Sequence, residues 1–420
     1  MGPDTLQTPE SIHQLRVNGR RLDRTIAQLA TIGALPQGGI SRLAFSSEDI
    51  QARSAVKRLM STAGMAITVD AAGNIIGRYS GYCPGAPALA TGSHLDSVPV
   101  GGIYDGTYGV LAGIEVVQTL HDSDIRLAHP IEVIVFTDEE STMVGSKAMA
   151  GQLRSGKDTG LLRDNLRRIG GSLDHLASVR RSIHDFAAFV ELHVEQGPVL
   201  EAAGNPIGLV TGIVGQRRYV ITIAGRASHA GTTPMAMRQD ALLAAAKLVV
   251  AVNRIGNAQT ADLSGEQVAT VGALTLTPNA VNTIPGQVEM TVDMRDLSDD
   301  CLDRMAALLE REIEAAAATT QTRILMQPTL QNKPAPANSH IHHTIGEACQ
   351  SLALDTLSLP SRASHDAQNM AYVTDMGMIF VPSRAGLSHA TDEYTSPHLC
   401  TQGANVLLQT LMRLDRHYRV

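Results

Sequence analysis

The most constraining feature of this 420-residue chain is a short apolar run that ends directly in a group of acids. Residues 131–136 (IEVIVF) predict a buried strand, because β-branched and apolar side chains favour a strand that is covered on both faces. Asp138, Glu139 and Glu140 follow almost at once. Burying an unpaired carboxylate is very costly, so these acids must face solvent, a cation or a proton donor.

The first half of the chain repeats this alternation of strand-like and helix-like segments. Residues 87–92 (PALATG) and 188–193 (AFVELH) are further strand-like runs, and residues 110–120 have the periodicity of a helix. Strands that alternate with helices predict a parallel α/β sheet. Ligand sites in such sheets lie beyond the carboxyl ends of the strands.

The pattern changes near residue 211 and predicts a second domain. Residues 217–224 (RRYVITIA) alternate as a half-exposed strand. The segments that follow are helices at 238–253 and 301–318 and strands at 269–276, 287–295 and 322–327. This order, β-α-β-β-α-β, predicts a self-contained α+β domain with one sheet and two helices.

The return to the first pattern follows a segment rich in proline. Residues 332–339 (NKPAPANS) predict a linker, and residues 342–354 predict a helix. A chain of 420 residues is also too long for one compact core. We therefore expect residues 1–212 and 333–420 to form an α/β domain with a mixed, largely parallel sheet and helices on both faces. Residues 213–332 are expected to be inserted into it.

Charge and composition argue against several classes of protein. The net charge is −7 and no basic tract is interleaved with aromatic residues, so nucleic acid and anionic membranes are not expected partners. No window holds 18 uninterrupted apolar residues, and the first 14 residues do not resemble a signal peptide. The four cysteines are scattered without a CxxC pair. We expect a reduced, cytoplasmic protein with a small-molecule substrate.

Four groups of chemically active residues lie at the carboxyl ends of predicted strands or in the turns beyond them, the last of these strands being residues 378–383 (MIFVPS). They are His94, Asp96 and Asp105; Asp138, Glu139 and Glu140; Glu191, His193, Glu195 and Gln196; and Ser388 with His389. The carboxyl ends of parallel strands meet at one edge of a sheet, so these groups can converge. Histidine and carboxylate ligands without cysteine suit Zn²⁺, Mn²⁺ or Co²⁺. An aspartate two residues from a ligand histidine can fix its tautomer, and two metals that share a carboxylate form a hydrolytic centre.

Each group also has a simpler interpretation. A single histidine is more often structural than a ligand, Asp96 can cap a turn, and Glu139 with Glu140 can form a solvated loop. The joint placement of all four groups after apolar strands favours the functional interpretation. From the residues alone, we expect a metal-dependent α/β hydrolase.

Two competing signatures fail on inspection. Residues 81–85 (GYCPG) resemble a nucleophile elbow with Cys83 as the nucleophile. That motif needs the backbone N–H of the next residue for its oxyanion hole, and Pro84 has none. The sequence also lacks GxxxxGK[ST] and a GxGxxG after a strand, so nucleotide binding has no support.

A set of motifs in a fixed order resembles a known family. The motifs are TGSHLDSVPVGGIYDG (91–106), FTDEES (136–141), ELHVEQGPVLE (191–201), GRASHAGTTPM (225–235), PNAVNTIPG (278–286), VDMRD (292–296), SHDAQNMA (364–371) and VPSRAGLSHATDE (381–393). Together they resemble the metal-dependent amidohydrolases of the M20 metallopeptidase superfamily, over about residues 20–415. The branch is that of N-carbamoyl-L-amino-acid hydrolases, β-ureidopropionases and allantoate amidohydrolases.

The resemblance implies two divalent metal ions per subunit, zinc or else manganese, cobalt or nickel. The implied ligands are His94, Asp105, Glu140, His193 and His389. His94 and His193 would bind one metal, Glu140 and His389 the other, and Asp105 would bridge them. Asp96 would orient His94, and Glu139 would be the general base.

The resemblance also implies the contacts with the substrate. Gln196 would lie beside the metals, and Gly386 would offer backbone contacts. Arg295 would pair with the substrate carboxylate, assisted by Asn282. His229 would reach the site of the partner subunit in a homodimer and stabilise the oxyanion. The inserted domain would then serve as lid and dimer interface.

Two segments depart from the family pattern. Ser141–Gly145 is shorter than the Gly-Ser-Arg-Phe-type segment of many relatives, and residues 362–366 (RASHD) replace the common Gly-Ala-Gly-His-Asp. The predicted reaction is hydrolysis of the ureido C–N bond of an N-carbamoyl-L-amino acid to the L-amino acid, CO₂ and ammonia. Allantoate amidohydrolase or β-ureidopropionase activity is the first alternative, and an M20-type dipeptidase or aminoacylase is the second. A non-catalytic scaffold is disfavoured because Glu139 has no ligand duty.

Overall fold

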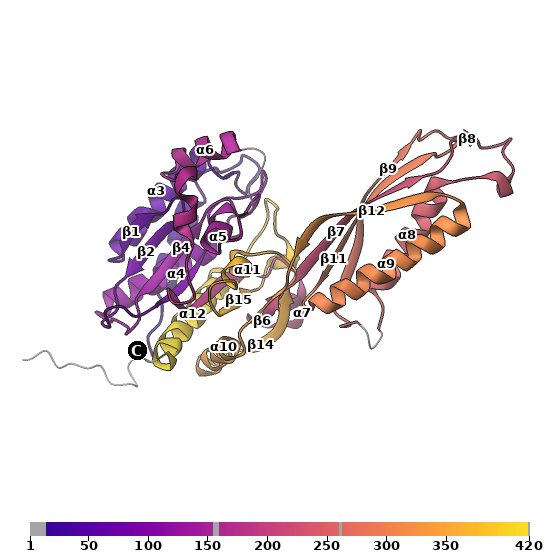
Figure 1. Ribbon diagram of the computed structural model, residues 1–420. Helices are drawn as coiled ribbons and strands as arrows, with labels where there is room; N and C mark the ends of the chain where they lie inside the picture. Colours follow the sequence, from indigo (N-terminus) through magenta and orange to yellow (C-terminus); the bar gives the residue numbers. More distant parts are fainter. Residues whose placement is uncertain (1–13, 154–158, 260–262, 419–420) are drawn as a thin grey trace, which may run out of the picture. The chain divides into compact units, whose positions relative to one another are not determined.

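A computed structural model describes residues 14–153, 159–259 and 263–418 of the chain (Figure 1). The chain divides into two compact units. The first comprises Met1–Thr211 and Ala337–Val420, and the second comprises Gly212–Pro336. The second unit is therefore continuous in sequence and interrupts the first.

The sheet of the first unit has a parallel centre with antiparallel flanks. Its strands, in spatial order, are β1 (Ala66–Val69), β2 (Ile75–Tyr79), β4 (Ile131–Phe136), β3 (Ala88–His94), β5 (Phe186–Val194), β15 (Met376–Val381) and β6 (Ile207–Ile213), and β14 (Thr356–Ser361) also pairs with β6. The pairs β4–β3, β3–β5 and β5–β15 are parallel, whereas β2–β4 and β15–β6 are antiparallel. The four parallel strands are almost entirely buried, which is the environment that their apolar sequences predict.

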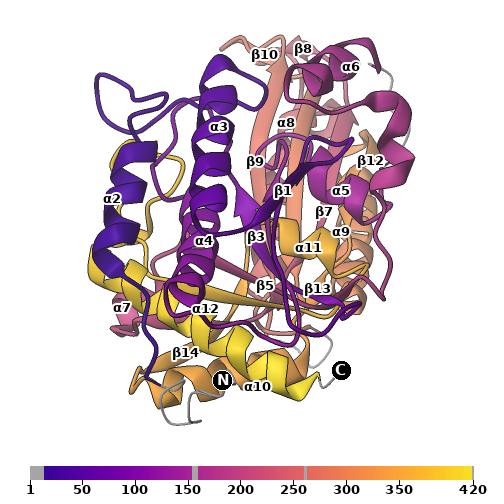
Figure 2. The ribbon, with the colours of Figure 1, turned by 90° about the vertical axis from the view of Figure 1, so that its left-hand side faces the viewer.

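Helices cover this sheet on both faces. On one face, α4 (Thr107–Asp122), α3 (Ser47–Thr62) and α12 (Pro397–His417) contact the sheet, and α2 (Gly19–Leu29) packs on α4 and α12 (Figure 2). The other face carries α11 (Asp366–Met370), which packs against α5 (Val144–Met149). The remaining elements of the unit are α6 (Thr159–Arg168), η1 (Leu173–Val179), α7 (Val199–Ala203), α10 (Ser339–Ser351) and η3 (Arg384–Gly386). The predicted class, a mixed and largely parallel α/β sheet, is confirmed.

The second unit has the predicted order of elements. Its antiparallel sheet, in the order β12-β7-β11-β9, consists of β7 (Gly215–Ala224), β9 (Val268–Thr277), β11 (Gln287–Asp296) and β12 (Arg323–Asn332). The helices α8 (Ala241–Gly256) and α9 (Asp299–Thr320) share one apolar core with this sheet. A two-stranded ribbon, β8 (Ser228–His229) with β10 (Thr283–Ile284), and the short helix η2 (Met235–Met237) complete the unit.

The segment predicted as a linker is more ordered than expected. β12 runs to Asn332, and β13 (Ala335–Pro336) pairs with Gly212 and Ile213 at the end of β6. Pro336 is tolerated because it ends a very short edge strand. In the part of the chain that the structure describes, no helix combines the length and apolarity needed to cross a bilayer.

Candidate metal centre

The candidate centre forms where the parallel strands end. His94 is the last residue of β3, and His193 is the penultimate residue of β5. Glu139 and Glu140 follow β4, and His389 follows β15 by a loop. Since β3, β4, β5 and β15 run parallel, their carboxyl ends meet at one edge and bring these residues together.

The turn before α4 places the bridging candidate Asp105 at this edge. Gly106 adopts a positive φ of 62°, a conformation that other residues rarely adopt. A Cβ atom at Gly106 would overlap the imidazole ring of His94. Glycine is therefore required both by the positive φ of the backbone and by the close approach of the His94 side chain.

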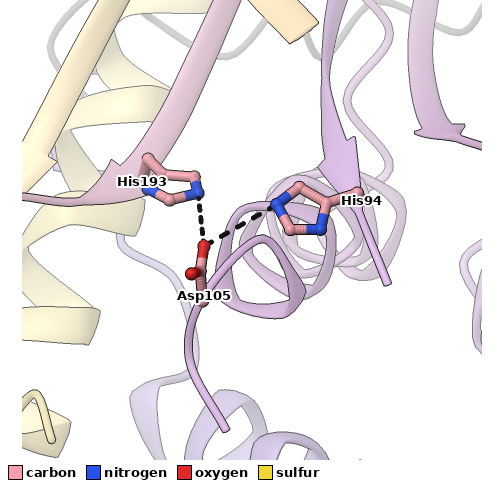
Figure 3. A group of neighbouring side chains, drawn as sticks. All are labelled: His94, Asp105 and His193. Atoms are coloured by element: carbon pink, nitrogen blue, oxygen red, sulfur yellow. Dashed lines mark ion pairs between the residues drawn. The ribbon is translucent and has the colours of Figure 1, made fainter. Parts of the chain in front are cut away.

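His94, Asp105 and His193 form the first group of ligand atoms (Figure 3). Asp105 Oδ1 lies 3.1 Å from His193 Nε2 and 3.7 Å from His94 Nε2. The other ring nitrogens contact backbone carbonyls, at 2.9 Å from His94 Nδ1 to Asp96 and 2.8 Å from His193 Nδ1 to Val194. A carbonyl can only accept, so both Nδ1 atoms carry a proton and both Nε2 atoms lie on the side of Asp105. This is the tautomer that binds a metal through Nε2.

Asp105, Glu140 and His389 form a second group. His389 Nε2 lies 3.1 Å from Asp105 Oδ2 and 3.4 Å from Glu140 Oε2. The two oxygens of Asp105 therefore face different groups, and each group offers three ligand atoms within 4.8 Å of one another. The donor set of three imidazoles and two carboxylates fits two divalent cations that share Asp105.

A third group, Glu191 with His193 and His365, is better explained by hydrogen bonding. Glu191 accepts hydrogen bonds from Ser93 Oγ at 2.8 Å and from the backbone N–H of Ala367 at 2.9 Å. Both carboxylate oxygens are thus occupied. His365 packs edge-on against His193, with ring centroids 4.5 Å apart. His365 thus supports the ring of His193 and was not among the predicted site residues, whereas Glu191 stood in one of the four groups without an assigned role.

The electrostatic environment of the centre favours positive charge. Burial opposes the charged form of His94, but the carboxylates of Glu139, Asp96 and Asp105 outweigh it and raise the pKa of His94 well above its ordinary value. Burial disfavours the Asp105 carboxylate, yet hydrogen bonds from His193 and His389 hold its pKa well below the usual range. A buried cluster that draws protons onto its histidines in this way is suited to cations.

Glu139 belongs to neither of the two ligand groups of the described residues that share Asp105. Its side chain is 9% exposed, and its Oε2 atom lies 3.7 Å from His94 Nε2. Burial raises the pKa of Glu139 well above its ordinary value, partly opposed by His94. A carboxylate beside the ligands with no ligand duty matches the requirements for a general base.

The structure differs from the contact expected for Asp96. Its backbone carbonyl, not its carboxylate, reaches His94 Nδ1, because the Oδ1 atom is 3.9 Å away. The carboxylate instead accepts the backbone N–H groups of Glu139 at 3.3 Å and Glu140 at 3.1 Å. Asp96 thus orients His94 through its main chain and holds the following acidic loop through its side chain.

Two substrate-contact candidates lie in the first unit. Gln196 Nε2 donates to Asp105 Oδ2 at 2.9 Å. Its Oε1 atom is buried and has no hydrogen-bond partner among the described residues. Gly386 has a φ of 67° and packs so closely on the backbone of Gly197 and Pro198 that a Cβ atom would clash. The structure therefore places Gly386 beside the segment that carries Gln196.

The other three candidates lie in the second unit. His229 is exposed, and its Nδ1 atom accepts the backbone N–H groups of Gly231 at 3.0 Å and Thr232 at 3.2 Å. The proton of neutral His229 is therefore on Nε2, which is a hydrogen-bond donor. The carbonyl of Asn282 accepts the N–H of Ala230 at 2.9 Å, so Asn282 lies beside His229 in the ribbon.

Arg295 lies on β11 of the same unit. Its Nε atom donates to Asp293 Oδ1 at 2.8 Å, and its side chain is half-buried. Asp293 also pairs with Arg218 at 2.9 Å. Arg295 is therefore engaged in an ion pair with a residue of its own strand, and its role in substrate binding stays a prediction.

The fold and the centre together define a class of protein. An inserted α+β unit, a parallel sheet and a His-carboxylate cluster with a shared aspartate are the features of a metal-dependent amide hydrolase. Residues 90–413 match the family model described as Peptidase family M20/M25/M40. The chain belongs to this family, which confirms the resemblance inferred from the motifs.

Known relatives support the same branch of the family. An N-carbamoyl-L-amino acid amidohydrolase of Geobacillus stearothermophilus is 38% identical over 410 residues, 95% of this chain and 99% of that protein. An allantoate amidohydrolase of Bacillus subtilis is 33% identical over 402 residues, 93% of this chain and 96% of that protein. The crystal structure of an amidase of the hydantoinase/carbamoylase family from Burkholderia multivorans has a TM-score of 0.88 at 38% identity, covering 95% of this chain and 98% of that chain.

Proposed function

We propose that the protein hydrolyses the ureido C–N bond of an N-carbamoyl-L-amino acid. The observation that carries the proposal is Asp105, whose two oxygens face two separate groups of metal-binding side chains. The buried Glu139 carboxylate next to them has no ligand duty. Such an arrangement serves hydrolysis, and the relative from Geobacillus stearothermophilus is named for this reaction.

Two divalent cations, zinc or else manganese, cobalt or nickel, would polarise the ureido carbonyl and lower the pKa of the attacking water. His94, Asp105, His193, Glu140 and His389 would hold them. Glu139 takes a proton from the water and returns it to the departing amine nitrogen. The bond between the carbamoyl carbon and this nitrogen breaks. The products are the L-amino acid and carbamic acid, which decomposes to CO₂ and ammonia.

The remaining contacts fix the substrate. Gln196 is held against Asp105 by its amide nitrogen, so its unpartnered Oε1 atom is available to accept from the terminal ureido nitrogen. We assign the substrate carboxylate to Arg295, with Asn282 assisting, because a guanidinium binds a carboxylate in a bidentate manner. Gly386 contributes its backbone. Asp96 acts as a support for His94 and for the acidic loop.

We propose a homodimer in which His229 acts in the site of the partner subunit. The Nε2–H of His229 is an exposed donor, as oxyanion stabilisation requires. The second unit, which we assign as lid and dimer interface, also exposes apolar side chains on α8 and near the ribbon. They are Met235, Met237, Leu242, Leu243, Val249, Val250 and Val281. Apolar groups gathered on one unit support its use as an interface.

The four cysteines are free, three of them buried, which supports the reduced, cytoplasmic location that we propose. Allantoate amidohydrolase activity is the second candidate, since the relative from Bacillus subtilis carries that name at 33% identity. The two reactions use the same centre and differ in the group attached to the ureido nitrogen. β-Ureidopropionase activity is the variant in which that group is a β-amino acid.

The test is ammonia release by metal-reconstituted protein from N-carbamoyl-L-methionine, N-carbamoyl-β-alanine and allantoate, each with an EDTA control. Turnover of the first substrate that EDTA abolishes supports the proposal. Faster turnover of either of the others replaces it with the corresponding alternative. If all three substrates are inert while dipeptides or acyl-amino acids are cleaved, the peptidase or aminoacylase alternative is correct.

A further inference from the structure

Glu393 is a buried acid that touches the candidate centre without belonging to its ligand groups. It lies in the loop that follows β15 and carries His389. Its Oε1 atom accepts two consecutive backbone N–H groups, of Tyr104 at 2.9 Å and of Asp105 at 3.1 Å. Through this contact, Glu393 fixes the main chain of the shared aspartate.

A second contact of Glu393 reaches the carboxylate of the same aspartate. Its Oε2 atom lies 2.8 Å from Ser388 Oγ, which is itself 3.1 Å from Asp105 Oδ2. Ser388 has one hydroxyl proton, so it donates to one of these carboxylates at a time. Gln196 Nε2 donates to Ser388 Oγ at 3.3 Å and completes the network.

The surrounding backbone is built to admit this side chain. A Cβ atom at Gly102 would overlap the carboxylate and the Cβ atom of Glu393, so only glycine leaves the required space. The Ser388–Glu393 contact also spans the tight turn in which His389 has a φ of 52°. A positive φ is unfavourable for a non-glycine residue and persists only where neighbouring contacts hold it. Glu393 therefore joins the loops of two candidate ligands.

We infer that Glu393 is a positioning residue that sets the orientation of Asp105 between the two metals and holds the His389 loop against it. The inference rests on the proposed two-metal function. One contact of Glu393 ends on the backbone N–H of Asp105, and the other holds Ser388, whose hydroxyl lies within hydrogen-bond distance of the Asp105 carboxylate. Rotation of that carboxylate would misplace a ligand of both metals at once. Removing a residue that hydrogen-bonds to a metal ligand typically lowers the metal affinity by about 10- to 100-fold.

The experiment is a Mn²⁺ titration of chelator-treated protein, followed by calorimetry and by metal content per subunit. The variants are Glu393→Ala, Glu393→Gln and Ser388→Ala. We expect wild type to bind two ions and Glu393→Ala to bind at least one of them about 10- to 100-fold more weakly. Excess Mn²⁺ should restore kcat of this variant, which a general loss of folding would not allow.

Glu393→Gln separates positioning from charge. The glutamine carbonyl can accept the same two backbone N–H groups, and its NH₂ can donate to Ser388 Oγ, whose proton then points to Asp105. We therefore expect its Mn²⁺ affinity to be closer to wild type than that of Glu393→Ala. If the two variants are equally weak, charge rather than geometry is responsible and the inference is wrong. If Glu393→Ala does not fold, the same Mn²⁺ titration of Glu393→Gln and Ser388→Ala tests the inference. Ser388→Ala is expected to lower the affinity for at least one ion.

Asp415 provides a matched control. It also accepts two consecutive backbone N–H groups, of His129 at 2.8 Å and of Ala128 at 3.2 Å, but at the amino end of β4. Asp415→Ala should lower the melting temperature and leave both Mn²⁺ affinities unchanged. Unchanged affinities in Glu393→Ala as well would overturn the inference.

The outcomes also separate this inference from the proposed function. In the first case, wild type binds two ions, Glu393→Ala has a lower affinity for at least one of them, and no ureido substrate is cleaved. The proposed reaction is then wrong and the positioning role stands. If substrate is cleaved and Glu393→Ala binds metal normally, the reaction stands and the positioning role is wrong. If wild type binds fewer than two ions, both fail.

Discussion

Replacing Glu139 by glutamine is the most direct test of the chemistry at this site. Glutamine has the size of glutamate but cannot take up a proton. Glu139 is 9% exposed and its Oε2 atom is 3.7 Å from His94 Nε2, so the change acts beside the ligands and not in bulk solvent. A positioned acid–base group contributes about 10²- to 10⁴-fold, so kcat should fall by this factor, equivalent to roughly 3–5 kcal/mol.

The assay is ammonia release at saturating substrate, combined with the metal content of the same samples. Glu139→Gln should retain two metals per subunit, because Glu139 lies outside the two ligand groups that share Asp105. Glu132→Gln is the matched control. Glu132 is a buried acid on β4, the strand that precedes Glu139, and it forms ion pairs with Arg78 and Arg181. It should lower stability and leave kcat unchanged. A Glu139→Gln enzyme with wild-type kcat, or one that has lost its metals, would refute the assigned role.

Four further predictions follow from the structure. Burial raises the pKa of Asp49 to about 6 from 3.8, so the unfolded chain ionises first and stability should fall as pH rises from about 4 to 6. Asp49→Asn should remove this pH-dependent part of the free energy of unfolding, which amounts to at most roughly 3 kcal/mol at neutral pH. Urea denaturation at pH 4 and pH 7 measures it, and an identical pH dependence in wild type and Asp49→Asn would contradict the prediction. Arg295→Lys should raise KM for carboxylate substrates more than it lowers kcat, because the bidentate contact is lost, and unchanged KM would contradict the assignment. Gly106→Ala should abolish Mn²⁺ binding, since its Cβ atom would overlap His94, and normal calorimetric binding would disprove this. Cys83 should be the one thiol that a disulfide reagent titrates in the folded protein, because the other three are buried, and a count of four without denaturant would be inconsistent with the fold.

The strands that the sequence predicts are those with the simplest environment. β3, β4, β5 and β15 are buried on both faces, so their side chains are almost uniformly apolar. β1 is half-exposed, and β14 contains Pro360, so neither has a clear pattern. The segment at residues 332–339 has a linker composition, and only tertiary pairing with β6 makes part of it a strand.

The candidate metal centre could likewise be predicted only in part from the sequence. The candidate ligands could be found because each lies at the end of an apolar strand or in the turn or loop beyond it, and the structure brings all five together. The sequence analysis expected Asp96 to contact His94 through its carboxylate, whereas the structure shows its backbone carbonyl in this contact. Spacing along the sequence cannot distinguish these two oxygens. Glu393 was missed because it lies in a polar loop without periodicity. Its partners Tyr104 and Asp105 are 289 and 288 residues away, and nothing in the local sequence marks such a contact.

The interrupted course of the first unit has a consequence for synthesis of the protein on the ribosome. β15 lies between β5 and β6 in the sheet, yet it is translated after the whole of the second unit. The second unit is continuous and can fold while the chain is still emerging, whereas β5 must wait with an unpaired edge. His389 arrives with the segment that closes this edge. The candidate ligand group of Asp105, Glu140 and His389 is thus completed only after the whole of the second unit has been translated.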